Sequence, residues 1–434
     1  MKSSIKNRIY ISLFLIIALD LFSCKHLENN FISFTDDEEI TTIYADDELE
    51  LYNAIDQLNK KGGTIYIDTP VINLYEKVSI SINGQLPGGI IGIRQSNGEY
   101  PRINFMQRTY FEESFPGINI YGSNKFIEYI IIENSPEFGV TLYGDNNILD
   151  HVISRYNYGS GFSIYGNFNT LNYCYAYRNF DTDVFSVKAD GFYIFGEVNN
   201  VFNYCFAWDN ANSGFNYARL FNSSELSYLH SGSWNNGNVN VFTGKYDYDN
   251  GNTLDKNLWS IQEIMESDPS FVSNYYNKKY NIEDAKLGGF SANEWISKIG
   301  PRLDGNGFTF GNRKSSQSID VKRNALYCVA FDHKSGGFID NYDHKYNAYI
   351  TNCASFNNEI NYKLPYTFSK WQNNWSWGSK NNDQLNVGIT TNKPTNTNRC
   401  QRLIYTVRDE IIQAVTANMF PDGVNFDSAL VRLG

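Results

Sequence analysis

Short apolar stretches alternate with polar residues along most of the chain, and the pattern repeats. The order Gly, apolar, any residue, apolar, aromatic, Gly begins at Gly117, Gly139, Gly161 and Gly191, at intervals of 22, 22 and 30 residues. Such alternation favours short β-strands, and the Gly- and Asn-rich segments between them favour turns. A repeat of about 20 to 30 residues built from short strands predicts a solenoid whose coils stack into parallel sheets.

A second strand pattern recurs out of phase with the first, and four of its copies carry a cysteine. The four are Cys174, Cys205, Cys328 and Cys353. Their positions follow the repeat and not the C-x-x-C spacing of metal sites. We interpret them as a column of small buried thiols, with disulfides or a metal as the alternatives.

The open end of a solenoid core needs a cover. Residues 46–61 are predicted to form an N-terminal capping helix that stops at Gly62 and Gly63. Four apolar residues share one face of this helix: Leu51, Ala54, Ile55 and Leu58.

The start of the chain is typical of an export signal. Lys2, Lys6 and Arg8 precede an apolar stretch at 9–21, and Leu-Phe-Ser-Cys then ends at Cys24 in the pattern of a bacterial lipobox. We predict a lipid on Cys24 that anchors a bacterial outer-membrane lipoprotein, facing the periplasm or the cell surface. An ordinary signal peptide or an uncleaved anchor is the alternative.

These patterns divide the chain into predicted parts. Residues 1–24 are the lipoprotein signal peptide and residues 25–44 are a polar tether. Residues 45–380 are the solenoid domain, and a polar insertion at 245–302 breaks its repeat. Residues 381–434 are predicted as a C-terminal cap or tail.

Composition narrows the class of partner. The net charge of −11 argues against nucleic acid and against an anionic membrane surface. The 32 Tyr, 30 Phe and 7 Trp residues are enough for a large core and for aromatic surfaces that stack on sugar rings. A polyanionic substrate would be repelled by this net negative charge unless a cation or a local positive charge compensated for it.

The stretch 117–364 resembles the family 9 polysaccharide lyases. The resemblance is carried by A-D-G-F, C-F-A-W-D-N-x-x-x-G-F, S-W-N-N-G, D-G-N-G-F and G-G-F-I-D-N, which begin at Ala189, Cys205, Ser233, Asp304 and Gly336. It implies an all-β fold, a right-handed single-stranded parallel β-helix of the pectin lyase-like type. It also implies cleavage of uronic-acid polysaccharides by β-elimination, with calcium on the uronate and a lysine as the base.

The same resemblance identifies four calcium-site positions and one catalytic position. The calcium positions are Asp190, Asn212, Ser213 and Asn216. Three of the four family carboxylates are therefore replaced, and calcium as the implied cofactor would have to bind Asp190 and neutral oxygens. The position of the family lysine is Thr309, which cannot remove a weakly acidic proton at neutral pH.

Other residues are candidates for a rebuilt site. Lys188, Lys314 and His333 are candidate bases because each lies close in sequence to a family-like motif. Tyr165 and Tyr193 are candidate sugar-binding residues, although they do not share a register within their repeats.

Three hypotheses for function follow. The first is a lyase-like protein that acts on an acidic polysaccharide by β-elimination through an altered site. The second is a β-helix without catalysis that binds glycan. The third is a glycoside hydrolase, for which Asp181 and Asp183 are the nearest paired carboxylates.

Overall fold

The structure is a computed structural model, and its described residues fall into separate ranges. These are 42–75, 79–105, 116–135, 137–157, 159–179, 189–195, 198–217, 223–237, 305–311, 320–340, 347–365, 368–386 and 388–433. Several sequence predictions lie outside them: the signal peptide with Cys24, most of the tether, the insertion at 245–302, Lys188, Lys314, Asp181 and Asp183.

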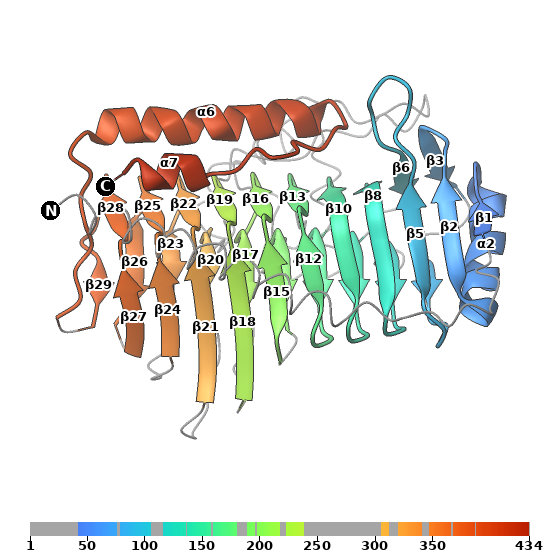
Figure 1. Cartoon of the computed structure of the whole chain (residues 1–434), viewed down its shortest axis with the longest axis horizontal. Coiled ribbons are helices and arrows are strands. Elements are labelled where there is room, and N and C mark those ends of the chain that lie inside the picture. The colour runs from blue at the N-terminus through green and yellow to red at the C-terminus, as the bar shows by residue number, and fades with distance from the viewer. Residues whose placement is uncertain are drawn as a thin grey trace, which may run out of the picture. The chain divides into compact units, whose positions relative to one another are not determined.

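Three parallel β-sheets run along the described part of the chain, because each coil contributes a strand to each (Figure 1). Sheet 1 has ten strands. They are β4 (Ile80–Ile82), β7 (Ile118–Ile120), β9 (Val140–Leu142), β11 (Phe162–Ile164), β14 (Phe192–Ile194), β17 (Phe215–Tyr217), β20 (Phe308–Thr309), β23 (Gly336–Ile339), β26 (Ile360–Leu364) and β29 (Gln384–Leu385).

Sheets 2 and 3 are joined by two long strands into one hydrogen-bonded system of 19 strands. Sheet 2 contains β1 (Thr42–Tyr44), β2 (Gly63–Ile67), β5 (Gly88–Gly92), β8 (Lys125–Glu133), β10 (Ile148–Arg155), β12 (Thr170–Asn172), β15 (Asn200–Asn203), β18 (Ser223–Leu229), β21 (Asp320–Leu326), β24 (Asn347–Thr351) and β27 (Phe368–Gln372). Sheet 3 contains β3 (Val71–Leu74), β6 (Arg102–Phe105), the ends of β8 and β10, β13 (Tyr175–Tyr177), β16 (Phe206–Trp208), β19 (Gly232–Trp234), β22 (Val329–Phe331), β25 (Ala354–Phe356) and β28 (Trp375–Trp377).

The predicted parallel β-helix is confirmed. The core lies between the three sheets, and aromatic rings at matched positions of sheet 1 stack along it. Phe162, Phe192 and Phe215 have ring centroids 4.8 and 4.5 Å apart, and the stack continues through Phe308 and Phe338. Cys174, Cys205, Cys328 and Cys353 are buried and free in the described structure, as the interpretation of a thiol column predicts.

The predicted N-terminal helix is also confirmed. Helix α2 (Glu48–Lys61) begins after Asp47, whose side chain accepts a hydrogen bond from Glu50 N. Its four predicted apolar residues are buried against the first coils. The helix therefore covers the end of the core that would otherwise be open.

The C-terminal segment lies along the side of the β-helix, whereas the sequence suggested an end cap or a tail. Helix α6 (Thr397–Thr416) runs lengthwise over the strands of sheet 3, followed by α7 (Asp427–Val431) (Figure 1). Ile404, Ile411 and Phe426 join a buried cluster with the outward aromatic residues of that sheet. The C-terminal segment lies here because the outward face of sheet 3 is a contiguous aromatic surface, and a surface of this kind has to be covered. None of the described helices is long and apolar enough to cross a bilayer.

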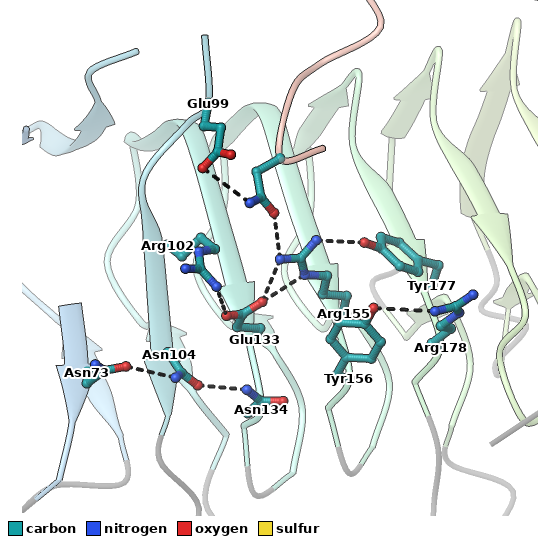
Figure 2. A network of polar contacts seen from close by, with 11 residues as sticks. Asn73, Glu99, Arg102, Asn104, Glu133, Asn134, Arg155, Tyr156, Tyr177 and Arg178 are labelled. Atoms are coloured by element: carbon teal, nitrogen blue, oxygen red, sulfur yellow. Dashed lines mark hydrogen bonds and ion pairs between the residues drawn. The ribbon is translucent and has the colours of Figure 1, made fainter. Parts of the chain in front are cut away.

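A buried ionic network ties the end of α6 to the sheets. Glu133 accepts hydrogen bonds from Arg102 Nη1 at 3.0 Å and from Arg155 Nε at 2.8 Å (Figure 2). Arg155 also donates to Tyr177 Oη and, from Nη2, to Asn418 Oδ1, both at 2.8 Å. Asn418 follows α6, so the charged pair positions the C-terminal segment.

Candidate functional site

The positions that the resemblance assigns to the calcium site come together on consecutive coils of sheet 1. Asp190 lies just before β14, and Asn212 and Ser213 lie just before β17. Asn216 is the central residue of β17 and pairs in register with Thr309 of β20. All five residues are buried.

The Asp190 carboxylate is surrounded by hydrogen-bond donors from the next coil. Asn212 Nδ2 donates to Asp190 Oδ1 at 2.6 Å, and Ser213 N donates to the same oxygen at 2.9 Å. Asn216 Nδ2 donates to Asp190 Oδ2 at 3.0 Å. Both carboxylate oxygens are therefore bound by N–H groups, which stabilise a buried negative charge.

The orientation of the Asn216 amide follows from its other partner. Thr309 Oγ1 donates to Asn216 Oδ1 at 3.1 Å, so the amide nitrogen is the end that faces Asp190. Thr309 Oγ1 in turn accepts from Tyr217 N at 2.9 Å. The threonine at the lysine position thus holds the asparagine at a calcium position in a donor orientation.

His333 belongs to a different structure, a ladder of asparagines inside the turns. Asn157, Asn179 and Asn210 each donate from the main-chain N–H to the side-chain oxygen of the asparagine one coil on, at 3.1, 3.2 and 2.9 Å. His333 takes the next place, where its Nδ1 accepts from Asn236 N at 3.3 Å. Its Nε2 donates to Ser233 O at 3.0 Å.

Burial lowers the pKa of His333 to about 3, although the contact with Ser233 O opposes this shift. The imidazole is therefore neutral at physiological pH, and both ring nitrogens bond the main chain. A base that removes a proton from a ligand needs a free nitrogen, and this geometry does not offer one. The sequence analysis did not predict this ladder. The recurrence of Asn at equivalent turn positions of successive coils could have indicated it.

The two tyrosines suggested for sugar binding lie on sheet 1 in different registers. Tyr193 is the central residue of β14 and pairs with Ser163 of β11, whereas Tyr165 directly follows β11. Their rings meet edge to face with centroids 6.4 Å apart. Tyr165 also stacks on Tyr143, and this contact leads to a row of tyrosines that sequence reasoning did not single out.

The row consists of Tyr121, Tyr143 and Tyr165, which follow β7, β9 and β11. Ring centroids are 4.7 and 5.1 Å apart, and the planes differ by 3° and 12°. Burial, then the neighbouring phenols and Glu137, raise the pKa of Tyr143 to about 12. The row is a neutral, hydroxyl-bearing aromatic edge along sheet 1.

Comparison with known proteins identifies the family. Residues 34–254, slightly more than half of the chain, match a family described as a Pel9A-like, right handed beta helix region. The chain belongs to this family. The predicted likeness to family 9 polysaccharide lyases is therefore confirmed, and with it the right-handed β-helix.

Two solved structures share the fold of this family member. Pectate lyase Pel9A is 18% identical, with a TM-score of 0.56, over 83% of this chain and 81% of that one. A rhamnogalacturonan lyase is 15% identical, with a TM-score of 0.53, over 83% of this chain and 88% of that one. At these identities the likeness shows the fold alone. No curated protein sequence matches the chain.

The residues at the family's calcium positions do not fit a calcium ion here. Calcium takes about 6–8 oxygen ligands, mostly carboxylates. In this family member Asp190 supplies one carboxylate, and the Asn212 and Asn216 amides turn nitrogen toward it. No group of three or more His, Cys, Asp or Glu residues in the described ranges has the arrangement of a metal site. The arrangement is a hydrogen-bonded cluster around the Asp190 carboxylate.

Proposed function

We propose that this protein is a polysaccharide-binding β-helix of the Pel9A-like family that does not carry out calcium-dependent β-elimination. The observation that carries the proposal is the set of three N–H donors around the Asp190 carboxylate. A β-elimination needs a group that neutralises the uronate carboxylate and a base that removes the adjacent proton. In this protein, the residues at the family's calcium positions and at its lysine position form a hydrogen-bonded cluster instead.

Electrostatics supports the same choice over a lyase with an altered site. A uronate carboxylate at this cluster would meet the buried Asp190 carboxylate, and like charges in a desolvated site repel strongly. Thr309 has its hydroxyl between Asn216 and the Tyr217 N–H. The remaining candidate bases, Lys188 and Lys314, lie outside the described residues, as do Asp181 and Asp183 of the hydrolase alternative.

Polysaccharide as the ligand is supported by the fold and by the aromatic edge of sheet 1. The two similar solved structures are a pectate lyase and a rhamnogalacturonan lyase, both named for polysaccharide substrates. Tyr121 and Tyr143 are exposed, and amphipathic rings of this kind suit sugars, which carry both C–H faces and hydroxyls. A lipid on Cys24 would present this surface from the bacterial outer membrane.

The test separates binding from cleavage. The mature protein is incubated with pectate, rhamnogalacturonan, alginate and neutral polysaccharides, with calcium or with a chelator. Affinity electrophoresis measures binding, and ultraviolet absorbance measures the unsaturated ends that elimination produces. We expect retarded migration in at least one polysaccharide and no new absorbance in any. New absorbance would overturn the non-catalytic part of the proposal, and unchanged migration throughout would overturn the binding part.

A further inference from the structure

The tyrosine row on sheet 1 has two different ends. At one end, Tyr165 meets Tyr193 and Phe195, with ring centroids 6.4 and 5.4 Å away. In the middle, Tyr143 has a parallel ring on each side. At the other end, Tyr121 follows β7, and the preceding coil has Asn83 at the matching position, since Ile82 pairs with Ile120. In the described structure, the face of Tyr121 toward Asn83 has no aromatic partner.

The surroundings of that face are polar and open. Tyr121 is 52% exposed, the largest exposed fraction in the row. Ser81, Asn83 and Gln85 on the preceding coil are exposed as well. The backbone here is held firmly, because Tyr121 N and Gly122 N both donate to Ile82 O, at 2.9 and 3.1 Å. The ring is exposed beside a coil whose exposed residues carry one hydroxyl and two amides, together with the apolar Leu86.

We infer that the open face of Tyr121 is a stacking platform for one uncharged sugar unit of the bound polysaccharide, an inference that rests on the proposed function. A pyranose ring presents C–H groups on its faces and hydroxyls at its edge. The C–H groups suit the negative face of a phenol ring, and the hydroxyls suit the bordering Asn83 and Gln85. Stacking on Tyr143 orders Tyr121 before the ligand arrives, which reduces the entropic cost of binding.

The charge around the row favours an uncharged sugar over a uronate. Glu137 helps raise the pKa of both Tyr143 and Tyr165, after burial as the largest cause, so a negative charge acts on the two rings that follow the platform in the row. Lys125, a lysine near this end of the row in the described structure, is buried with its Nζ on Leu86 O. A carboxylate on the platform would also lie against the electron-rich ring face.

The test compares Tyr121→Ala with the wild type, using neutral xylo-, manno-, galacto- and arabino-oligosaccharides and, as the acidic arm, oligogalacturonides. Isothermal titration calorimetry measures the affinity. We expect Tyr121→Ala to weaken binding of a neutral oligosaccharide about tenfold, and Tyr121→Phe to retain it, because stacking needs the ring and not the hydroxyl. Tyr75→Ala is the matched control, because Tyr75 is 45% exposed and lies outside the row.

The outcomes separate this inference from the proposed function. Equal affinity of the wild type and Tyr121→Ala for the neutral ligand overturns the platform while polysaccharide binding stands. If the wild type binds oligogalacturonides but none of the neutral oligosaccharides, the inference that the sugar on the platform is uncharged is wrong. If the wild type binds no polysaccharide of either class, the proposed function fails and the platform fails with it. Unchanged melting temperatures of the variants would show that any loss of affinity is local.

Discussion

At the scale of single residues, the charge of Asp190 is stabilised by donors that come from the next coil. A buried carboxylate needs either a cation or several hydrogen-bond donors. The amides of Asn212 and Asn216 supply two of these donors, and Ser213 N supplies a third. Exchanging amide for carboxylate at two positions would therefore change what the cluster can bind.

Replacing Asn212 and Asn216 together by aspartate would place three carboxylates in one buried cluster. Without a cation this should destabilise the fold by about 3–5 kcal/mol, the usual cost of an uncompensated buried charge. Calcium should offset the loss because it binds clustered carboxylates. We expect the melting temperature of the double variant to rise with calcium and fall with a chelator, while that of the wild type is unchanged.

The matched control for this variant is Asn172→Asp with Asn203→Asp. These two asparagines also lie on neighbouring coils, where Asn203 Nδ2 donates to Asn172 Oδ1 at 3.4 Å, but they are only half-buried. Their replacement should cost little and should not create a strong response to calcium. A wild-type protein that itself melts higher with calcium would contradict our account of the Asp190 cluster.

Because His333 is buried with a lowered pKa, we expect the free energy of unfolding to depend on pH. Its pKa falls from the ordinary 6.5 to about 3 on folding, so the unfolded chain binds the proton more readily. Above pH 6.5 the His333 side chain is neutral in both the folded and the unfolded chain. As the pH falls from 6.5 toward 3, the unfolded chain takes up the proton first, and the free energy of unfolding decreases. The loss is about 1.4 kcal/mol per pH unit in that window.

His333→Asn should remove this part of the acid sensitivity. Asparagine is the residue at the neighbouring ladder positions, Asn236 and Asn358, so the substitution keeps a side-chain acceptor in the turn. Denaturant unfolding at a series of pH values measures the effect. A slope between pH 6.5 and 3 that is the same in the variant and the wild type would show that other groups cause the acid sensitivity.

At the scale of elements, the attachment of α6 depends on the ionic network beneath it. Burial raises the pKa of Glu133, but Arg155 and Arg102 together outweigh burial and hold that pKa below its usual range. Glu133→Gln would leave Arg155 buried without its counter-charge. We expect a loss of about 3–5 kcal/mol in unfolding free energy.

The same substitution should loosen the C-terminal segment, because Arg155 also holds Asn418. Hydrogen exchange of the amides in 397–433 should become faster, and proteolysis there should increase. Glu128→Gln is the control from the same strand: burial raises the pKa of Glu128, so removing its charge costs little. Similar exchange rates in both variants would contradict a role for the network in docking.

The elements differ in how far the sequence predicts them. The strands and α2 follow from the spacing of apolar residues, which is a local property. The position of α6 does not, because an outward row such as Trp208 and Trp234 has the same sequence pattern whether it binds sugar, faces the core or is covered by a helix. The ladder of asparagines likewise depends on registers between coils that lie 22 to 31 residues apart.

The sequence predicted which residues form the candidate site and that three carboxylates are missing, but not how the remaining side chains hydrogen-bond. Resemblance located Asp190, Asn212, Ser213 and Asn216, and these residues do lie together. Which end of the Asn216 amide faces Asp190 depends on Thr309, 93 residues further along the chain. Contacts of that kind exist only once the coils have stacked.

At the scale of the whole molecule, a β-helix is stabilised by neighbouring coils, and its first coil has a neighbour on one side only. Helix α2 takes the place of the missing coil, with Leu51 and Leu58 fully buried. The exposed edge of a parallel sheet otherwise pairs with other chains. The capping helix therefore protects the molecule from end-to-end association as well as completing its core.

Leu58→Asp should expose that end. A charged side chain cannot be buried there, so α2 should detach and leave the edge strands β1, β3 and β4 uncovered. We expect oligomers in size-exclusion chromatography with light scattering, at concentrations where the wild type stays monodisperse, together with a lower melting temperature. Leu49→Asp is the control, because Leu49 lies on the same helix and is 70% exposed. If Leu58→Asp lowers the melting temperature without association, the helix stabilises the core but is not needed to block the edge.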